Sequence, residues 1–589
     1  MKKRMMVSTA LLLMLVNIAT AQTPRKFKSW EPATDNSIYA LEGQGWRGDT
    51  SDYYTRLPPA AKSKVRDHVW NLSRNSTGLS LRFKSNADEI VVKYRITGSA
   101  SMPHMPATGV SGVDLYVKSI DGRWMFCAGD YAFDSTVVYR FKNLKTTDQH
   151  VKNVEYTLFL PLYNSVKSLS ISVPEESYFK PMPVRAEAPV VVYGTSIAQG
   201  GCASRPGMAW TNILERKLDR PVINLGFSGN GRMEKEVVAF LAEIPASLYV
   251  LDCLPNLTPA EYTNAEIKRR IAECVKLLQE KRPGIPILLT EHDGYTNETN
   301  VERMDSYVRV NKALKEVADS MLKAGMKNIT VLTKEEIGQD PDAMVDGTHP
   351  TDLGMMAYAN AYAKKIHAIF REREGNTVTT TPVTQRRDAG IYDWETRHYE
   401  VLAYNKAHSP KVLFIGNSIT NFWGGNPVSS VIRGSSSWDK YFAPKQTVNM
   451  GFGWDRVENV LWRMQHGELD GIQPEYIVLM IGTNNLQLNT DAEIVDGLKN
   501  LLQVIQEKQP AAKIILMGIL PRKNMEARVA GINKLIARIP GNNKIRFANA
   551  GSLFLQADGK LRENLFSDGL HPNEQGYEKL GAFIDKYLK

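Results

Sequence analysis

One arrangement of three polar residues occurs twice in this chain, and equivalent residues of the two copies are 222 positions apart. In the first copy, Ser196 follows the apolar run VVVYG, and Asp346 and His349 lie 150 and 153 residues further on, in VDGTHP. In the second copy, Ser418 ends the run VLFIGNS, and Asp568 and His571 again lie 150 and 153 residues further on, in SDGLHP. Two copies with equal spacing predict two domains of one fold, each of which brings its Asp and His back to its serine.

These residue types together can carry out acyl transfer. The serine hydroxyl attacks a carbonyl carbon, the imidazole takes up the serine proton, and the carboxylate fixes the imidazole tautomer. We therefore predict one catalytic triad in each copy, with serine as nucleophile, histidine as base and aspartate as orienting residue. A proline follows each histidine, and since proline favours the first turn of a helix, we expect both histidines at a helix start.

Strand and helix patterns divide the 589 residues into three folded parts. Short runs such as EIVVKYRIT and YTLFLPLY, separated by turn residues, predict an all-β sandwich over residues 22–187. Apolar strands then alternate with amphipathic helices over 188–371 and again over 388–589. This alternation predicts two flavodoxin-like α/β domains, each a parallel sheet with helices on both faces. The polar, Thr-rich segment 372–387 is expected to be a flexible linker.

Further candidate residues follow the second and third strands of each predicted sheet, at the strand ends where such folds bind ligands. Gly229 in NLGFSGNG and Asn256 in LDCLPN belong to the first α/β domain. Trp454 in NMGFGWDR and Asn484 in IGTNN hold the corresponding places in the second. A backbone N–H and a side-chain amide can together stabilise an oxyanion, and we predict that role for these four residues.

The first residues resemble an export signal. The basic start MKKR is followed by an apolar run from Ala10 to Ile18 and by Ala19-Thr20-Ala21, which matches a signal-peptidase site. We therefore expect residues 1–21 to be a signal peptide and the mature protein to be periplasmic or secreted. Gln22 rather than cysteine follows the expected cut, which does not support a lipid anchor.

Charge and cysteine patterns exclude several other functions. The formal net charge is +10, but basic and acidic residues are interspersed and no run of five basic residues occurs, so nucleic-acid binding is not expected. The cysteines lack metal-site spacing, and we expect buried thiols, with one disulfide as an alternative. These cysteines are Cys127, Cys202, Cys253 and Cys274. Acyl transfer by a serine needs no metal or other cofactor, and none is expected.

The blocks that contain the candidate residues resemble those of the SGNH (GDSL-type) hydrolase family, over both α/β domains. In the second, IGNSITNFW and ILMGILPR are similar to platelet-activating-factor acetylhydrolase catalytic subunits. In the first, YGTSIAQGGCASRPGMAW resembles a bacterial subfamily whose N-terminal β-domain is named for a G-x-D-L-Y motif, here residues 112–116. The resemblance implies a serine esterase in which the backbone amides of both serines also stabilise the oxyanion.

Three residues depart from the family pattern. Thr195 and Asn417 stand where the family has an aspartate before the serine, a position outside the triad, so we expect activity in both domains. Trp454 stands where the family has the oxyanion glycine. Its backbone N–H can still donate, but its ring is expected to narrow or line the pocket, which favours a small acyl group or a stacked sugar.

These observations favour a two-headed carboxylic ester hydrolase that removes O-acetyl groups from carbohydrate, with acetylated hemicellulose such as xylan as the best candidate. The expected partner is an acetylated oligo- or polysaccharide, without membrane insertion. Two alternatives stay open: a lipid or lysophospholipid acyl hydrolase, and a glycan-binding protein with only one active copy. The first would need an apolar lid, and the second would be expected to lack a triad residue.

Overall fold

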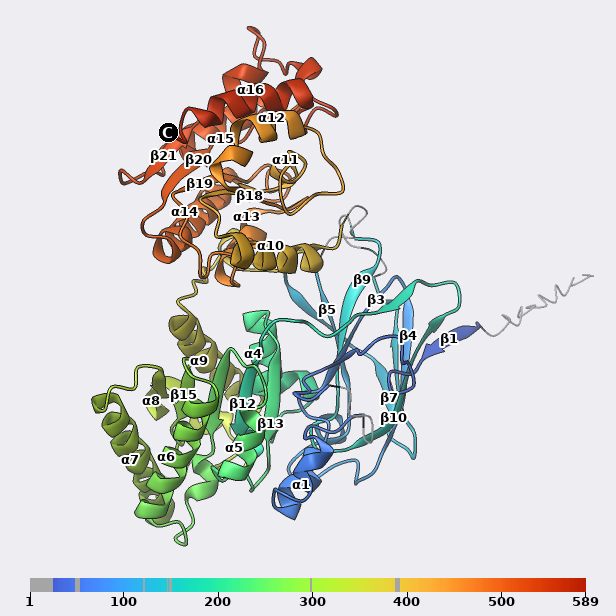
Figure 1. The fold of residues 1–589 in the computed structure, drawn as a ribbon. Helices are drawn as coiled ribbons and strands as arrows, with labels where there is room; N and C mark the ends of the chain where they lie inside the picture. Colours follow the sequence, from blue (N-terminus) through green and yellow to red (C-terminus); the bar gives the residue numbers. More distant parts are fainter. Residues whose placement is uncertain are drawn as a thin grey trace, which may run out of the picture.

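A computed structural model describes residues 25–47, 53–119, 122–145, 147, 151–296, 299–386 and 392–589. A β-rich part is followed along the chain by two α/β parts (Figure 1). The predicted signal peptide, residues 1–21, lies outside the described residues. Within the described ranges, no helix is both long enough and apolar enough to cross a bilayer.

The β-rich part consists of two antiparallel sheets, which confirms the predicted all-β region. The strand orders are β1-β10-β4-β8-β7 and β11-β3-β9-β5-β6, with β2 paired to β3. Side chains of both sheets, such as Phe83 on β3 and Val92 on β4, share one buried core. The strands are β1 Phe27–Trp30, β2 Leu41–Glu42, β3 Ser80–Ser85, β4 Glu89–Ile96, β5 Asp114–Lys118, β6 Trp124–Cys127, β7 Asp130–Ala132, β8 Val137–Lys142, β9 Val154–Phe159, β10 Val166–Pro174 and β11 Phe179–Pro181. Two short helices, α1 Asp67–Ser73 and α2 Ala107–Val110, lie between them in sequence.

The first α/β domain is a parallel sheet of order β13-β12-β14-β15-β16. Its strands are almost wholly apolar because helices cover both faces: α5, α6 and α7 pack on one, and α4 and α9 on the other. The strands are β12 Val190–Gly194, β13 Val222–Gly226, β14 Leu248–Asp252, β15 Ile287–Thr290 and β16 Ile329–Leu332. The helices are α3 Ser196–Gln199, α4 Trp210–Leu218, α5 Lys235–Leu241, α6 Asn264–Lys281, α7 Val301–Lys323, α8 Lys334–Ile337 and α9 Asp352–Phe370.

The second α/β domain repeats this architecture, with strand order β18-β17-β19-β20-β21. Helices α10, α13, α14 and α15 cover one face, and α12 and α16 the other. The strands are β17 Val412–Gly416, β18 Thr447–Gly451, β19 Tyr476–Met480, β20 Lys513–Met517 and β21 Ile545–Ala548. The helices are α10 Trp394–His408, α11 Ser418–Asn421, α12 Ser435–Tyr441, α13 Val457–Gln465, α14 Asp491–Lys508, α15 Glu526–Ile536 and α16 Glu574–Asp585. Both sheets have the flavodoxin-like order 2-1-3-4-5, as predicted.

The Thr-rich segment 372–387 is not the flexible linker that its composition predicts. Its described part packs against the second α/β domain: Thr379 is fully buried, and its hydroxyl donates to the Glu493 carbonyl on α14 at 2.6 Å. Val383 is only 4% exposed. Threonine hydroxyls that bond to backbone carbonyls let a polar segment pack closely, and composition alone does not reveal such contacts.

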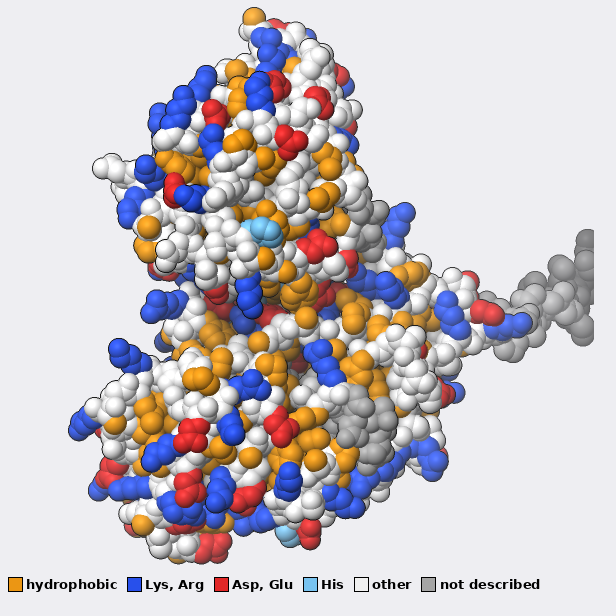
Figure 2. All heavy atoms as spheres, viewed as in Figure 1, with side chains coloured by type: hydrophobic (Ala, Val, Ile, Leu, Met, Phe, Trp, Pro, Cys, Tyr) orange, Lys and Arg blue, Asp and Glu red, His pale blue; other side chains and the backbone are white. Residues whose placement is uncertain are grey.

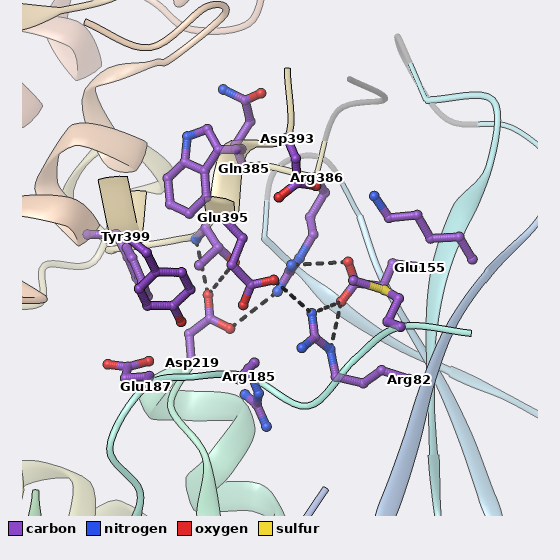
Figure 3. A pocket seen from close by; sticks show the side chains of 15 residues that line it. Arg82, Glu155, Arg185, Glu187, Asp219, Gln385, Arg386, Asp393, Glu395 and Tyr399 are labelled. Atoms are coloured by element: carbon purple, nitrogen blue, oxygen red, sulfur yellow. Dashed lines mark hydrogen bonds and ion pairs between the residues drawn. The ribbon is translucent and has the colours of Figure 1, made fainter. Parts of the chain in front are cut away.

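Arg386, at the end of the described segment, lies where the three parts of the chain meet (Figure 3). Its guanidinium pairs with Glu155 of the sandwich at 3.1 Å and with Asp219 of the first α/β domain at 3.5 Å. Lys118 of the sandwich contacts the same Asp219 at 2.5 Å. Although burial raises it, these two cations hold the pKa of the Asp219 carboxyl below its ordinary value.

This charged junction occupies the waist of the molecule, where acidic and basic side chains gather between the second α/β domain and the rest (Figure 2). The cavity among its side chains measures about 40 Å³. A space of this size holds a few water molecules but no sugar ring. The junction is therefore a structural contact between domains rather than a ligand pocket.

Candidate active sites

Each predicted nucleophile is the first residue of a one-turn helix directly after the first strand of its sheet. Ser196 begins α3, and Ser418 begins α11. The side chains of Thr195 and Asn417 each accept a hydrogen bond from the backbone amide two residues on. A helix-capping side chain suits this position, so threonine and asparagine fill it in place of the family's aspartate.

In the first α/β domain, the structure brings the three predicted triad residues together. The Ser196 hydroxyl lies 2.8 Å from His349 Nε2, and His349 Nδ1 lies 2.8 Å from Asp346 Oδ2. The other oxygen of Asp346 accepts from the His349 backbone amide at 2.8 Å. The contacts connect a nucleophile to a base and the base to a carboxylate, as acyl transfer requires.

The second α/β domain contains the same arrangement. The Ser418 hydroxyl lies 2.8 Å from His571 Nε2, and His571 Nδ1 lies 2.7 Å from Asp568 Oδ2. The Asp568 Oδ1 atom accepts from the His571 backbone amide at 2.8 Å. Both groups are therefore complete and share one geometry.

Hydrogen bonds keep both aspartates ionised. Partial burial raises the pKa of Asp568, but backbone and side-chain hydrogen bonds from His571 lower it to about 2. The same balance, with His349 as donor, leaves the pKa of Asp346 below its ordinary value. Burial lowers the pKa of His571 and outweighs the opposing effect of Asp568. The second triad is thus set up with a charged carboxylate and a neutral base.

The histidines lie in short closed loops, and the expectation that their prolines begin a helix is wrong. Pro350 and Pro572 pair with residues six positions earlier as isolated bridges. The next helices, α9 and α16, begin only two residues after each proline. In α16, the Asn573 side chain caps the helix by accepting from a backbone amide. An asparagine side chain can accept this bond and proline cannot, so the helix starts later than predicted.

Gly229 and Trp454 have the same backbone conformation, with a φ angle of +66° at each. This left-handed region favours glycine, and bulky side chains rarely adopt it. A Cβ atom built at Gly229 would meet nothing within 4 Å, so the loop offers open space where the second domain has an indole ring. Trp454 is 42% exposed. The shared conformation supports the predicted equivalence of the two positions.

Asn256 and Asn484 follow the third strands, but their amides are held differently. Asn256 Oδ1 accepts from the Gly231 backbone amide at 3.0 Å. Asn484 instead donates from Nδ2 to the Asp455 carbonyl at 3.0 Å. Because a side-chain amide nitrogen carries two hydrogens, both arrangements leave an N–H for an oxyanion.

Residues of the β-sandwich reach the first active site, and no motif in the sequence identified them. The Tyr163 hydroxyl donates to the Ser196 carbonyl at 3.1 Å. The His104 ring lies against that of His349, with 5.9 Å between the ring centroids. The Thr77 hydroxyl donates to a carbonyl of α3 at 2.7 Å. The sandwich therefore supports the nucleophile turn and adds a side chain beside the histidine.

The G-x-D-L-Y motif lies at this same contact between domains. Asp114 Oδ2 accepts from the Arg205 guanidinium and from the Gly207 amide, both at 2.7 Å. The guanidinium also donates to the Tyr116 hydroxyl at 2.7 Å. A Cβ atom at Gly112 would lie 2.3 Å from a backbone oxygen, so a side chain does not fit there. The motif thus joins the sandwich to the loop between α3 and α4.

All four cysteines lie among the described residues. Their thiols are free. Cys202, Cys253 and Cys274 are buried, and Cys127 is partly buried. They are packing residues, as the main interpretation expects, and the alternative of a disulfide is not found.

Family models match three stretches of the chain. Residues 28–179 match the N-terminal domain of SGNH-hydrolase-type esterases, named GxDLY. Residues 187–367 and 414–579 each match models of the GDSL-like lipase/acylhydrolase family. These matches coincide with the sandwich and the two α/β domains.

Individual relatives agree with these matches. The platelet-activating factor acetylhydrolase IB subunit alpha1 of Bos taurus is 30% identical over 202 residues, 33% of this chain and 82% of the relative. A solved structure from Bacteroides ovatus, described as a GDSL-like lipase, is 32% identical with a TM-score of 0.53, over 59% of this chain and 98% of its own. A salicylyl-acyltransferase of a tetracycline biosynthetic pathway, 17% identical with a TM-score of 0.50 over 58% of this chain and 97% of its own, shares the fold. The chain belongs to the GDSL-like (SGNH) lipase/acylhydrolase family, with two hydrolase domains preceded by a GxDLY domain.

Proposed function

We propose that this protein is an exported esterase with two active sites that removes O-acetyl groups from carbohydrate. The observation that carries the proposal is the pair of complete Ser–His–Asp arrangements, one at the strand ends of each parallel sheet. Acetylated hemicellulose such as xylan is the substrate that we favour. Export follows from the predicted signal peptide, and the protein would act in the periplasm or outside the cell.

The reaction follows from the geometry in two steps. The serine hydroxyl attacks the acetyl carbonyl carbon while histidine Nε2 takes the serine proton. The histidine returns that proton to the sugar oxygen as the ester bond breaks, which leaves an acetyl-serine. A water molecule, deprotonated by the same histidine, then attacks the acetyl-serine, releases acetate and restores the serine.

Each tetrahedral intermediate carries a negative oxygen. We assign its stabilisation in the first active site to the backbone amides of Ser196 and Gly229 and the side-chain amide of Asn256. In the second, we assign it to the Ser418 and Trp454 amides together with Asn484. Removal of one such donor typically costs about 3–4 kcal/mol of transition-state stabilisation.

Two observations support an acetyl group, and a third supports a carbohydrate as the alcohol part of the ester. The named activity of the Bos taurus relative is removal of an acetyl group, and a tryptophan at the rim of the second active site favours a short acyl chain. Exposed rings can stack on sugar rings, and the chain has several. Trp454 is 42% exposed, and Phe126 and Tyr131 of the sandwich are 46% and 55% exposed.

Acetate release from acetylated xylan and other acetylated glycans tests the proposal. The wild type should be compared with Ser196→Ala, Ser418→Ala and the double variant, with 4-nitrophenyl acetate as a small ester. Each single variant should keep partial activity, and the double variant should lose nearly all. If one single variant removes all activity and the other none, only one site is active. Faster hydrolysis of an acetylated phospholipid than of any glycan would favour the lipid alternative.

A further inference from the structure

The two active sites differ in the residues beside the Asp–His loop. The Lys523 amide donates to the glycine carbonyl of the SDGLHP loop at 2.9 Å, and the Thr296 amide donates to the glycine carbonyl of the VDGTHP loop at 3.3 Å. These matching bonds identify Lys523 and Thr296 as equivalent positions. The residues directly before them, Arg522 and Tyr295, are therefore equivalent as well.

Arg522 lies beside two parts of the second active site. Its guanidinium donates to the Thr483 carbonyl at 3.3 Å, directly before the oxyanion candidate Asn484. Its charge also acts on Asp568 of the triad. A guanidinium has five N–H groups, and within the described ranges this is the one hydrogen bond that the Arg522 side chain makes. Donors therefore remain for a ligand.

Arg433, in the loop before α12, supplies a second cation at the same site. Its guanidinium lies 3.3 Å from Asp568 Oδ2 and 5.3 Å from the centre of the Phe422 ring. The Phe422 ring in turn lies against the imidazole of His571, with 5.1 Å between the centroids. Arg433 thus pairs with the Asp568 carboxylate, and the charge of Arg522 also acts on it, so that two cations face one anion beside His571.

The fold does not require this charge. In the first active site, a neutral tyrosine, Tyr295, fills the position of Arg522. The histidine also returns its proton to the leaving alcohol, so the alcohol part of the ester lies beside the imidazole. Groups near His571 therefore contact that part of the substrate.

We propose that the second active site takes acetyl esters whose alcohol part carries an anionic group, carboxylate or phosphate, close to the ester, and that Arg522 and Arg433 bind that group. A guanidinium pairs with either anion through two parallel hydrogen bonds. In acetylated carbohydrate the group would be the carboxylate of a uronic acid or a sugar phosphate. The first active site, with Tyr295, takes neutral esters. This inference rests on the proposed esterase function.

The test uses the full chain with Ser196→Ala, in which only the second active site is complete. Substrates are an acetylated methyl glucoside, the corresponding glucuronate and the corresponding 6-phosphate, each with the acetyl group on the same hydroxyl. We expect kcat/KM to be at least about tenfold higher for an anionic ester than for the neutral one. The anion that gives the larger ratio identifies the substrate class.

Substitutions of Arg522 and of a control arginine then show whether the preference depends on Arg522 itself. Arg522→Gln should reduce the preference for the anionic ester to less than about threefold. Arg522→Lys keeps the charge but not the two parallel donors, so it should keep only part of the preference. Arg538→Gln, a control with the same charge change at an exposed arginine after α15, should leave the preference intact. In a Ser418→Ala chain, the first active site should show no preference, and Tyr295→Arg should raise its relative rate on the anionic esters.

Different outcomes would overturn the anion site and the esterase activity of the second site. Equal rates on neutral and anionic esters in the Ser196→Ala chain, or an unchanged preference in Arg522→Gln, would overturn the anion site. Failure of the Ser196→Ala chain to hydrolyse 4-nitrophenyl acetate or any of the three sugar esters would instead contradict esterase activity at the second site. A preference that Arg538→Gln removes as fully as Arg522→Gln would point to long-range charge and against a binding role for Arg522.

Discussion

Arg56 and Arg397 fill the same place in the two hydrolase domains, although Arg56 belongs to the sandwich and Arg397 to α10. Arg56 donates to the Gly226 carbonyl at 2.8 Å, and Arg397 to the Gly451 carbonyl at 2.8 Å. Each guanidinium also lies over the phenylalanine that follows, at 4.9 and 5.3 Å from the ring centre. Different parts of the chain thus supply the donors that buried carbonyls at the end of the second strand require.

This equivalence predicts that each arginine supports its own active site. Arg56→Met leaves buried carbonyls without a donor, which costs about 1–3 kcal/mol for each group. It should lower the urea midpoint and reduce kcat/KM in the Ser418→Ala chain, where the first active site works alone. Arg397→Met should do the same for the second active site in the Ser196→Ala chain. Equal losses at both sites from either variant would contradict independent support.

Trp454 should restrict the length of the acyl group. Trp454→Gly removes the ring, keeps the backbone N–H and relieves a left-handed conformation that costs about 1–2 kcal/mol for residues other than glycine. In the Ser196→Ala chain, this variant should hydrolyse butyryl and hexanoyl nitrophenyl esters faster relative to acetyl. Gly229→Ala in the Ser418→Ala chain adds only a methyl group at the equivalent position and is the matched control. An unchanged chain-length preference in Trp454→Gly would exclude this role.

The second active site should stay active in mild acid. Burial lowers the pKa of His571, and the positive charges of Arg433 and Arg522 lower it further, whereas Asp568 raises it. Because the base works in its neutral form, the acid limb of kcat/KM in the Ser196→Ala chain should lie below the ordinary histidine pKa of about 6.5. Arg522→Gln removes a nearby cation and should move the limb to higher pH. A limb at or above pH 6.5 in the parent would contradict this prediction.

The packed Thr-rich segment predicts where an isolated second domain should begin. A fragment of residues 372–589 includes the buried Val383 and Thr379, whereas a fragment of residues 388–589 lacks both. Burial of a valine side chain contributes about 1.5–3 kcal/mol, so the longer fragment should have the higher free energy of unfolding in urea. Both fragments should hydrolyse 4-nitrophenyl acetate. Equal stability would mean that the segment contributes nothing to the domain.

The alternation of apolar strands with amphipathic helices predicted the two parallel sheets, and the repeated spacing indicated which serine, aspartate and histidine would meet. This was possible because the strand ends of a parallel sheet lie at one edge, so residues distant in sequence but placed after strands converge. The left-handed turn at Gly229 and Trp454 could also be inferred, since a glycine in one copy indicates the backbone conformation of the other.

Contacts between domains could not be predicted in the same way. Asp114 was visible in the G-x-D-L-Y motif, but its partners Arg205 and Gly207 carry no pattern that links them to it. Tyr163 and His104 lie in ordinary loop sequences and reach the first active site only because the sandwich docks there. Such pairings depend on tertiary packing, which local sequence periodicity does not encode.

The junction around Arg386 has a consequence for long substrates. The Arg386 guanidinium pairs with the sandwich and with the first α/β domain, and its own segment packs on the second. The two candidate nucleophiles, Ser196 and Ser418, therefore keep one relative orientation. When a polymer is bound at one site, its effective concentration at the other site rises only if the polymer is long enough to reach both. On the proposed carbohydrate substrates, the two sites should act independently on short oligosaccharides and together on a polysaccharide chain long enough to reach both.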